Sequence, residues 1–270
     1  MKVFKWLIDF YIESSLHVAL AVYALICITF IKLELPYDES VAYFSFFGTI
    51  VGYNFIKYDE LARIKKVKLT PTFKAIIFLS FVSFCASLYY FFQLQPRTKI
   101  YAFIGLMIIV LYTLPFFPNK LNLRNWAGVK IYLVAMAWVL VTVLLPVLNA
   151  NYDFDLIVGL KCIQRFILVF VLMLIFEIID LQDDANYLQT IPQKLGIKAT
   201  KNLTFLLLII FVALDYFKPN VTSKDIIVIS LVAVIIGVFT FFANAKRSKY
   251  YTSLWVEAIP IFWLILMLTY

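Results

Sequence analysis

The sequence predicts an all-α integral membrane protein with about nine transmembrane helices, on three observations. Its 270 residues are 64% hydrophobic and only 15% charged, whereas soluble domains are about 45–50% apolar and about 25% charged. Apolar segments recur near the length of about 20 residues that a helix needs to cross a bilayer. The alternating pattern of outer-membrane strands is missing from the sequence. These observations exclude a soluble globular enzyme, a disordered chain and a disulfide scaffold.

The elements follow one another as a single polytopic membrane domain over residues 1–270. Residues 1–14 combine basic and aromatic residues with the acids Asp9 and Glu13. This mixture predicts an amphipathic helix at the membrane surface rather than a cleaved signal peptide. The longest polar stretch, 180–201, is too short to fold alone. We expect spans at residues 15–33, 40–56, 73–92, 100–118, 127–148, 156–179, 202–217, 225–243 and 252–269.

The loops between the predicted spans alternate in charge. One set is rich in lysine and arginine, and the other set is short and poorer in them. Cytoplasmic loops carry the excess of basic residues, so we expect a cytoplasmic N-terminus, an outward C-terminus and a multi-pass protein of the inner (cytoplasmic) membrane. The same bias accounts for the net charge of +8, and nucleic-acid binding is not expected. The basic loops are 57–72, 119–130, 180–201 and 244–251, and the poorer ones are 34–39, 93–99, 149–155 and 218–224.

One segment, residues 177–184, concentrates carboxylates where the sixth span meets the cytoplasm. Glu177, Asp180 and Asp184 are spaced three and four residues apart, which places them on one face of a continuing helix. Carboxylate oxygens are hard ligands that suit Mg²⁺ carrying a phosphate group. An ionisable residue as close to the apolar core as Glu177 marks a candidate functional site. The spacing alone leaves a second interpretation open, in which these acids are only solvated at the membrane interface.

The stretch 177–196 resembles the second aspartate-rich motif of the UbiA-type intramembrane prenyltransferases. That motif reads DxxDxxxD, followed after a short spacer by a Thr-Leu-Pro-like element and a Leu-Gly pair. Asp180 and Asp184 match two of its acids, and Glu177 stands at the position of the first aspartate. The predicted spans also match the family's layout, and residues 128–138 look like its fifth helix. Further matches are Thr190, Pro192, Leu195 and Gly196 in the trailing element and Thr142 and Pro146 after the fifth helix.

The family's first motif, NxxxDxxxD at the cytoplasmic end of the second helix, is only partly present. Asn54 matches its asparagine, but Tyr58 and Ala62 stand where the two acids are expected. Asp59 and Glu60 follow Tyr58 and are turned by about 100–200° from the motif's face on a regular helix. In the family, the two acidic motifs resemble two walls that hold Mg²⁺ around a diphosphate. Because one wall is largely missing here, we expect one Mg²⁺ rather than two.

The resemblance implies a UbiA-like helical bundle and assigns roles to individual residues. Prenyl transfer breaks a carbon–oxygen bond, so metal ions and basic side chains must neutralise the leaving diphosphate. Any single basic residue is also explained by the positive-inside bias. The candidate catalytic residues are Asp180 and Asp184, the candidate metal ligands are Glu177, Asp180, Asp184 and Asp59, and the candidate diphosphate-binding residues are Asn54, Arg63, Tyr112, Lys120 and Lys130.

The leading functional hypothesis is transfer of a prenyl group from a prenyl diphosphate to a lipophilic acceptor, for example an aromatic one, with Mg²⁺ as cofactor. The alternative is a catalytically silent UbiA-like homologue that binds lipid or serves as a membrane subunit of a larger complex. The broken first motif supports this alternative. A small transporter is a third option, but few ionisable residues lie near the middle of the spans. The expected partners are membrane lipid and, for the enzyme, the prenyl diphosphate and its acceptor.

Arg165 lies within the sixth span. A charge buried in a membrane is costly and needs a partner or a route to the interface. We expect Asp153 or Asp155, in the neighbouring loop, to pair with this guanidinium. The single histidine, His17, excludes a metal site built on two histidines.

Overall fold

The computed structural model describes residues 2–64, 70–116, 122–123, 126, 128–183, 186–218 and 221–269. Within these ranges all regular secondary structure is helical. The α-helices are α1 (Lys2–Glu13), α2 (Leu16–Lys32), α3 (Glu39–Ile64), α4 (Pro71–Gln93), α5 (Pro96–Thr113), α6 (Lys130–Val139), α7 (Leu145–Asn149), α8 (Leu156–Ile179), α9 (Ile191–Ala213), α10 (Ser223–Phe242) and α11 (Ile259–Thr269).

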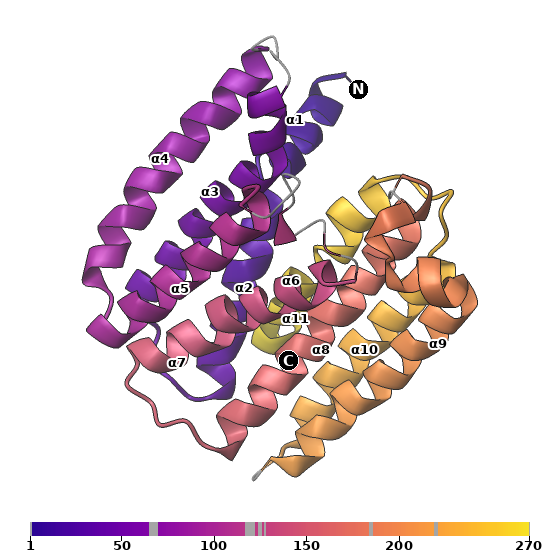
Figure 1. The fold of residues 1–270 in the computed structure, drawn as a ribbon. Coiled ribbons are helices and arrows are strands. Elements are labelled where there is room, and N and C mark those ends of the chain that lie inside the picture. Colours follow the sequence, from indigo (N-terminus) through magenta and orange to yellow (C-terminus); the bar gives the residue numbers. More distant parts are fainter. Residues whose placement is uncertain are drawn as a thin grey trace.

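The helices pack side by side in one bundle, and successive helices run back and forth along it (Figure 1). Helices α3, α4 and α5 lie on one side, and α9 and α10 lie on the other. A π-helical turn, Leu140–Leu144, joins α6 to α7, and a second one, Tyr251–Val256, precedes α11. The last helix, α11, packs against α2, so the end of the chain returns to the first long helix and closes the bundle.

Helix α8 lies at the centre of the bundle because its 24 residues are almost wholly apolar. In its most apolar stretch 72% of the residues are buried inside the protein, against 17–28% in the corresponding stretches of α4, α5, α9, α10 and α11. Leu168 and Leu174 are among its fully buried side chains. The outer helices instead expose large apolar side chains, such as Phe78 and Phe81 of α4. An apolar outer surface around an apolar centre requires lipid as the surrounding solvent.

Seven helical segments of the described chain are long and apolar enough to span a membrane, and the bent pair α1–α2 raises that number to eight. The protein is therefore a multi-pass membrane protein. Helix α3 is long enough, with 26 residues, but it is less apolar because polar residues such as Thr49, Asn54 and Lys57 interrupt it. The count of nine spans and the orientation of the two termini stay predictions.

A sharp bend separates α1 from α2. The backbone of Ser15 has a φ of 63°, and the two helices are bent by 60° relative to one another. Helix α1 therefore leaves the direction of the bundle. Its apolar side chains Phe4, Trp6 and Leu7 are at least half exposed, as expected for a helix that rests on lipid headgroups. That position at the membrane surface stays a prediction.

Helix α9 begins at Ile191, inside the stretch 180–201 that we expected to be a loop. The reason is local, because Pro192 occupies the first turn of the helix, where its missing N–H is not needed. Gly196, with a φ of 80° and a ψ of 159°, then interrupts the helical backbone, a conformation that glycine adopts at little cost. The predicted seventh span, 202–217, is thus part of a longer helical segment.

Candidate functional site

The carboxyl end of α8 holds the described acids of the second motif. Glu177 is only 3% exposed, and its Oε2 accepts the backbone N–H of Ile191, the first residue of α9, at 3.1 Å. Helix α8 ends at Ile179, and Asp180 begins a short 3₁₀ turn. The argument for one continuous helix face therefore applies to Glu177 and Asp180, whereas Asp184 lies outside the described residues.

The donor set for a metal is small. Among the residues that the structure describes, no group of three or more His, Cys, Asp or Glu side chains lies close enough to hold a metal ion. Glu177 and Asp180 supply carboxylate oxygens, the hard ligands that Mg²⁺ prefers. Asp184 and the side chain of Glu60 lie outside the described residues.

A backbone contact joins the two segments that carried the family resemblance. The N–H of Gly128 donates to the carbonyl of Leu188 at 2.9 Å, and α6 begins two residues later at Lys130. Gly128 has a φ of 72°, and a side chain built there would lie 3.9 Å from the Nζ of Lys194. The start of α6 and the start of α9 are therefore neighbours, and each carries a lysine, Lys130 on α6 and Lys194 on α9.

An apolar cavity of about 440 Å³ lies between α6, α8 and α9. Ile191, whose N–H binds Glu177, is one of its lining residues. Among the described residues of the lining, Lys194 is the single charged one. The cavity thus begins beside the acidic end of α8 and extends over apolar and aromatic side chains. Its other lining residues are Tyr132, Phe166, Ile167, Phe170, Leu195, Leu203 and Leu207.

Asn54, the residue that matches the first motif, is engaged in structural contacts. It is only 4% exposed, and its Nδ2 donates to the carbonyl of Ser14 at 3.1 Å and to the hydroxyl of Ser80 at 2.8 Å. Its Oδ1 accepts the hydroxyl of Ser15 at 2.8 Å. Both amide protons are used, so Asn54 connects α3 to the α1–α2 bend and to α4.

The next turn of α3 continues the same contact. Lys57 donates through Nζ to the carbonyl of Ile12 at 3.1 Å, and Tyr58 donates through its hydroxyl to the carbonyl of Glu13 at 2.9 Å. These carbonyls belong to the last residues of α1, whose acceptors have no partner within the helix. A cation there also complements the negative end of the helix dipole. The face of α3 that the first motif would use therefore caps α1.

Asn54→Ala is expected to lower the free energy of unfolding by about 2 kcal/mol, because the buried carbonyl of Ser14 and hydroxyl of Ser15 lose their partner. The measurement is reversible unfolding in mixed detergent micelles. Asn202→Ala, at an exposed position of α9, is the matched control and should leave stability within about 0.5 kcal/mol. Equal stability of the two variants would contradict the structural role of Asn54.

The other candidates of the first motif and its surroundings are scattered. Asp59 is half-buried on α3, and Tyr112 is buried on α5, where it interacts electrostatically with Tyr53. Lys130 is half-buried at the start of α6. The side chain of Arg63 and the whole of Lys120 lie outside the described residues.

Glu257 is a carboxylate that the sequence reasoning did not single out. It precedes α11 and interacts electrostatically with Lys57 and Tyr53 of α3. The hydroxyl of Tyr53 also accepts the indole N–H of Trp138 from α6 at 2.8 Å. The signal was present in the sequence, since Glu257 is an acid inside the predicted span 252–269, and such residues are functional candidates by default.

The predicted partner of Arg165 is wrong. Its guanidinium donates through one nitrogen to the carbonyl of Leu25 at 3.1 Å and the hydroxyl of Thr142 at 2.8 Å, and through another to the hydroxyl of Thr29 at 3.3 Å. Asp155 instead accepts the N–H of Val158 at 2.9 Å and caps α8. Arg165 points across the bundle toward α2 and not back to the preceding loop.

Comparison with known proteins gives the fold. No protein-family model and no curated protein matches the sequence. The apo structure of a UbiA homologue from Aeropyrum pernix K1 matches with a TM-score of 0.66 and 14% identity over 94% of this chain and 97% of that one. A structure of digeranylgeranylglyceryl phosphate synthase matches with a TM-score of 0.59 and 14% identity over 97% of this chain and 96% of that one.

A UbiA homologue from Archaeoglobus fulgidus, in its structure bound to GPP and Mg²⁺, matches with a TM-score of 0.59 and 11% identity over 97% of this chain and 98% of that one. The match covers nearly the whole of both chains. The all-α, multi-pass bundle described above therefore has the fold of the UbiA homologues.

Proposed function

We propose that this protein binds a prenyl diphosphate with Mg²⁺ and transfers its prenyl group to a lipophilic acceptor. One observation carries the proposal: the carboxylate end of α8 adjoins an apolar cavity at Ile191, which contacts Glu177 and lines the cavity. A prenyl diphosphate has the same two parts, an anionic head and an apolar chain. The structures of the fold neighbour bound to GPP and Mg²⁺ and to DMAPP and Mg²⁺ support it.

The donor set fits one Mg²⁺. Mg²⁺ is usually bound by one or two carboxylates together with waters and the phosphates of a substrate, and Glu177 and Asp180 meet that need. When bound, the ion neutralises charge on the diphosphate as the carbon–oxygen bond breaks. Asp184 would add a third carboxylate to this set.

The protein's own side chains have separable tasks in this proposal. Glu177 and Asp180 would hold the metal, and Lys130 and Lys194 would supply positive charge to the head group from the starts of α6 and α9. The apolar lining of the cavity would hold the prenyl chain by hydrophobic contact. The bond from the prenyl carbon to the diphosphate oxygen breaks, a bond to the acceptor forms, and the acceptor loses a proton.

A second function is favoured by the cap on α1. Asn54, Lys57 and Tyr58 bind the carbonyls of Ser14, Ile12 and Glu13, so the face that carries the first acidic wall in the family is occupied here by a helix end. A protein built in this way suits a catalytically silent homologue that binds a lipid or serves as a membrane subunit. This candidate predicts prenyl-lipid binding without Mg²⁺ dependence and without turnover.

The test compares Asp180→Asn with Asp183→Asn. Asp183 is exposed and lies three residues further on, so it is a matched control for charge and position. Geranyl diphosphate binding by the purified protein should require Mg²⁺, and Asp180→Asn should weaken it by about tenfold or more. Asp183→Asn should leave it unchanged. Equal binding by both variants, or binding that ignores Mg²⁺, would favour the silent homologue.

A further inference from the structure

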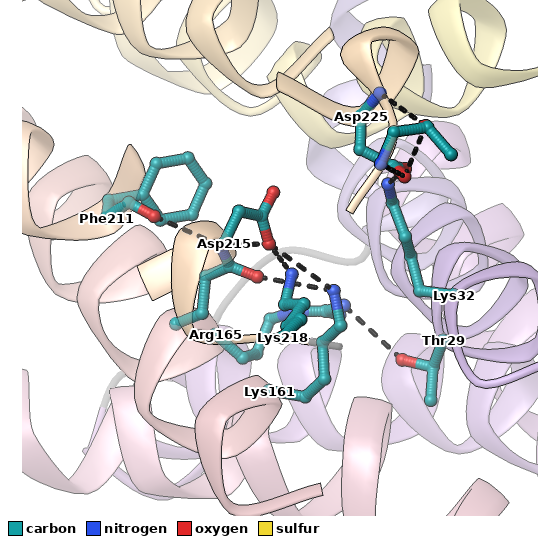
Figure 2. Close-up of polar contacts among 10 residues, drawn as sticks. Thr29, Lys32, Lys161, Arg165, Phe211, Asp215, Lys218 and Asp225 are labelled. Atoms are coloured by element: carbon teal, nitrogen blue, oxygen red, sulfur yellow. Dashed lines mark hydrogen bonds and ion pairs between the residues drawn. The ribbon is translucent and has the colours of Figure 1, made fainter. Parts of the chain in front are cut away.

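Six charged side chains, which we call the basic cluster, lie near one another (Figure 2). Lys161 of the cluster and Glu177 are sixteen residues apart on α8, about 24 Å along a helix. The basic cluster is therefore separate from the proposed diphosphate site. Its members are Lys32 at the end of α2, Lys161 and Arg165 on α8, Asp215 and Lys218 after α9, and Asp225 in the first turn of α10.

Two ion pairs form the rim of the basic cluster. Lys32 pairs with Asp225, and Lys218 pairs with Asp215. The side chains of Lys32 and Lys218 are each 11% exposed, that of Asp225 is 32% exposed and that of Asp215 is 1% exposed. Each of these two lysines is thus paired with a carboxylate, and the rim opens toward solvent at Asp225.

Lys161 lies deeper and has no carboxylate to itself. Its side chain is 7% exposed, and its Nζ lies 3.9 Å from the Oδ1 of Asp215, the oxygen that Lys218 already contacts. Its Nζ also lies 3.5 Å from the side-chain oxygen of Gln164. Asp215 must therefore serve two ammonium groups, and one positive charge is left over.

Arg165 adds a second surplus charge. It is 4% exposed, and its contacts with Leu25, Thr29 and Thr142 are all to neutral oxygens. A guanidinium keeps its charge under all ordinary conditions. The basic cluster thus holds four cations and two carboxylates among the described residues.

A buried surplus of two positive charges is expensive unless a counter-charge enters. Lysine and arginine side chains that converge from several elements are the groups that bind phosphate oxygens in proteins. A phosphate monoester carries a charge of about −1.5 to −2 at neutral pH, which matches the surplus. We propose that the basic cluster is a binding site for a phosphate-bearing group, with Lys161, Lys218 and Arg165 facing its oxygens.

The position of the cluster admits two sources of this group. It lies at the end of the membrane-spanning helices α2, α8, α9 and α10, where lipid headgroups and the aqueous phase meet. The shared chemistry is a phosphate with two negative charges, either free inorganic phosphate or the headgroup phosphate of phosphatidic acid. The experiment uses both as probes.

The test measures binding of inorganic phosphate by calorimetry, in detergent, and thermal stability in mixed micelles of phosphatidylcholine with or without phosphatidic acid. Lys161→Met and Lys218→Met each remove one cation and keep the apolar stem. Lys224→Met, at an exposed position of α10 beside the cluster, is the matched control. Loss of one charge-assisted contact should weaken binding by about tenfold, and the control should bind like the wild type.

Phosphate binding that depends on Lys161 or Lys218 assigns the site to free phosphate. Stabilisation by phosphatidic acid alone, lost in the same variants, assigns it to a lipid headgroup. Two results overturn the proposal. One is that neither probe distinguishes the wild type from both cluster variants. The other is that Lys224→Met weakens binding as much as Lys161→Met. The effect would then come from the overall positive charge of the surface and not from a specific site.

Discussion

Asp215→Asn is expected to destabilise the folded protein by about 3–5 kcal/mol, the usual cost of removing one partner from a buried ion pair. Asp215 is fully buried, and its Oδ1 contacts Lys161, Lys218 and the amide of Gln164. Asparagine keeps the shape and one acceptor but removes the charge. Two ammonium groups then share a buried site without a carboxylate, and the folded state bears the cost of that repulsion.

The effect should be measured by reversible unfolding in mixed micelles, in buffer free of phosphate. The double variant Asp215→Asn/Lys161→Met removes one positive charge together with the negative one, so the net charge of the cluster equals that of the wild type. It should recover most of the lost stability, which a double-mutant cycle quantifies. Asp153→Asn, at an exposed loop position, is the control. A loss below about 1 kcal/mol would place Asp215→Asn among ordinary surface substitutions and contradict the ion-pair argument.

The deficit should also depend on pH. Burial and the neighbouring Lys161 lower the pKa of Lys218, so the folded protein binds fewer protons than the unfolded chain. Stability therefore rises as the pH increases below the unfolded value of lysine. Loss of Asp215 lowers the pKa of Lys218 further, so the deficit of Asp215→Asn should shrink as the pH is raised through the lowered pKa of Lys218 in the wild type.

Much of the fold follows from local sequence alone. Apolar length places a helix at each predicted span, because a helix satisfies its own backbone in lipid. The central position of α8 is also visible, since residues 166–176 are apolar on all sides of the helix and such a helix is buried. What the pattern missed is the start of α9 at Ile191. Polar residues in that first turn read as a loop, although a proline at this position favours a helix start.

The candidate site was predictable only where spacing decides it. The interval between Glu177 and Asp180 places both at one end of α8, and the structure keeps them there. The contact of Glu177 with Ile191 joins residues from two helices, and no periodicity encodes it. The same holds for the contact between Ser15 and Asn54, which are 39 residues apart.

The departure at Tyr58 gains a physical reason from the fold. An acid at this position would face the carbonyl of Glu13, which needs a donor. Tyrosine supplies that donor, and a carboxylate would add negative charge at the negative end of α1. The end of α1 packs against this face of α3. This contact explains why Tyr58 stands where the first motif has an acid. The sequence shows only that the motif lacks this acid, whereas the structure shows the contact that Tyr58 makes instead.

Glu177→Gln is expected to weaken Mg²⁺-dependent binding of geranyl diphosphate, and any release of diphosphate, by about 100-fold while the fold stays intact. Glu177 has two separable duties in the proposed function. Its Oε2 accepts the N–H of Ile191, and its negative charge would hold the metal. Glutamine keeps an acceptor for the N–H and loses the charge, so the variant isolates the second duty.

Two further variants make this separation measurable. Glu177→Ala removes the acceptor as well, so it should also lower the free energy of unfolding by about 1–3 kcal/mol, the cost of leaving a buried N–H without a partner. Glu34→Gln, at an exposed position beyond the other end of the bundle, makes the same chemical change away from the site and should alter neither property.

The combination of results decides between the two proposed functions. Loss of Mg²⁺-dependent binding in Glu177→Gln, at wild-type stability, requires a carboxylate whose charge acts on the ligand. If Glu177→Gln instead binds geranyl diphosphate like the wild type while Glu177→Ala is destabilised, the side chain serves only the junction of α8 and α9. The acids at the end of α8 would then have a structural role, like the face of α3 that caps α1. The geometry would in that case support the catalytically silent homologue.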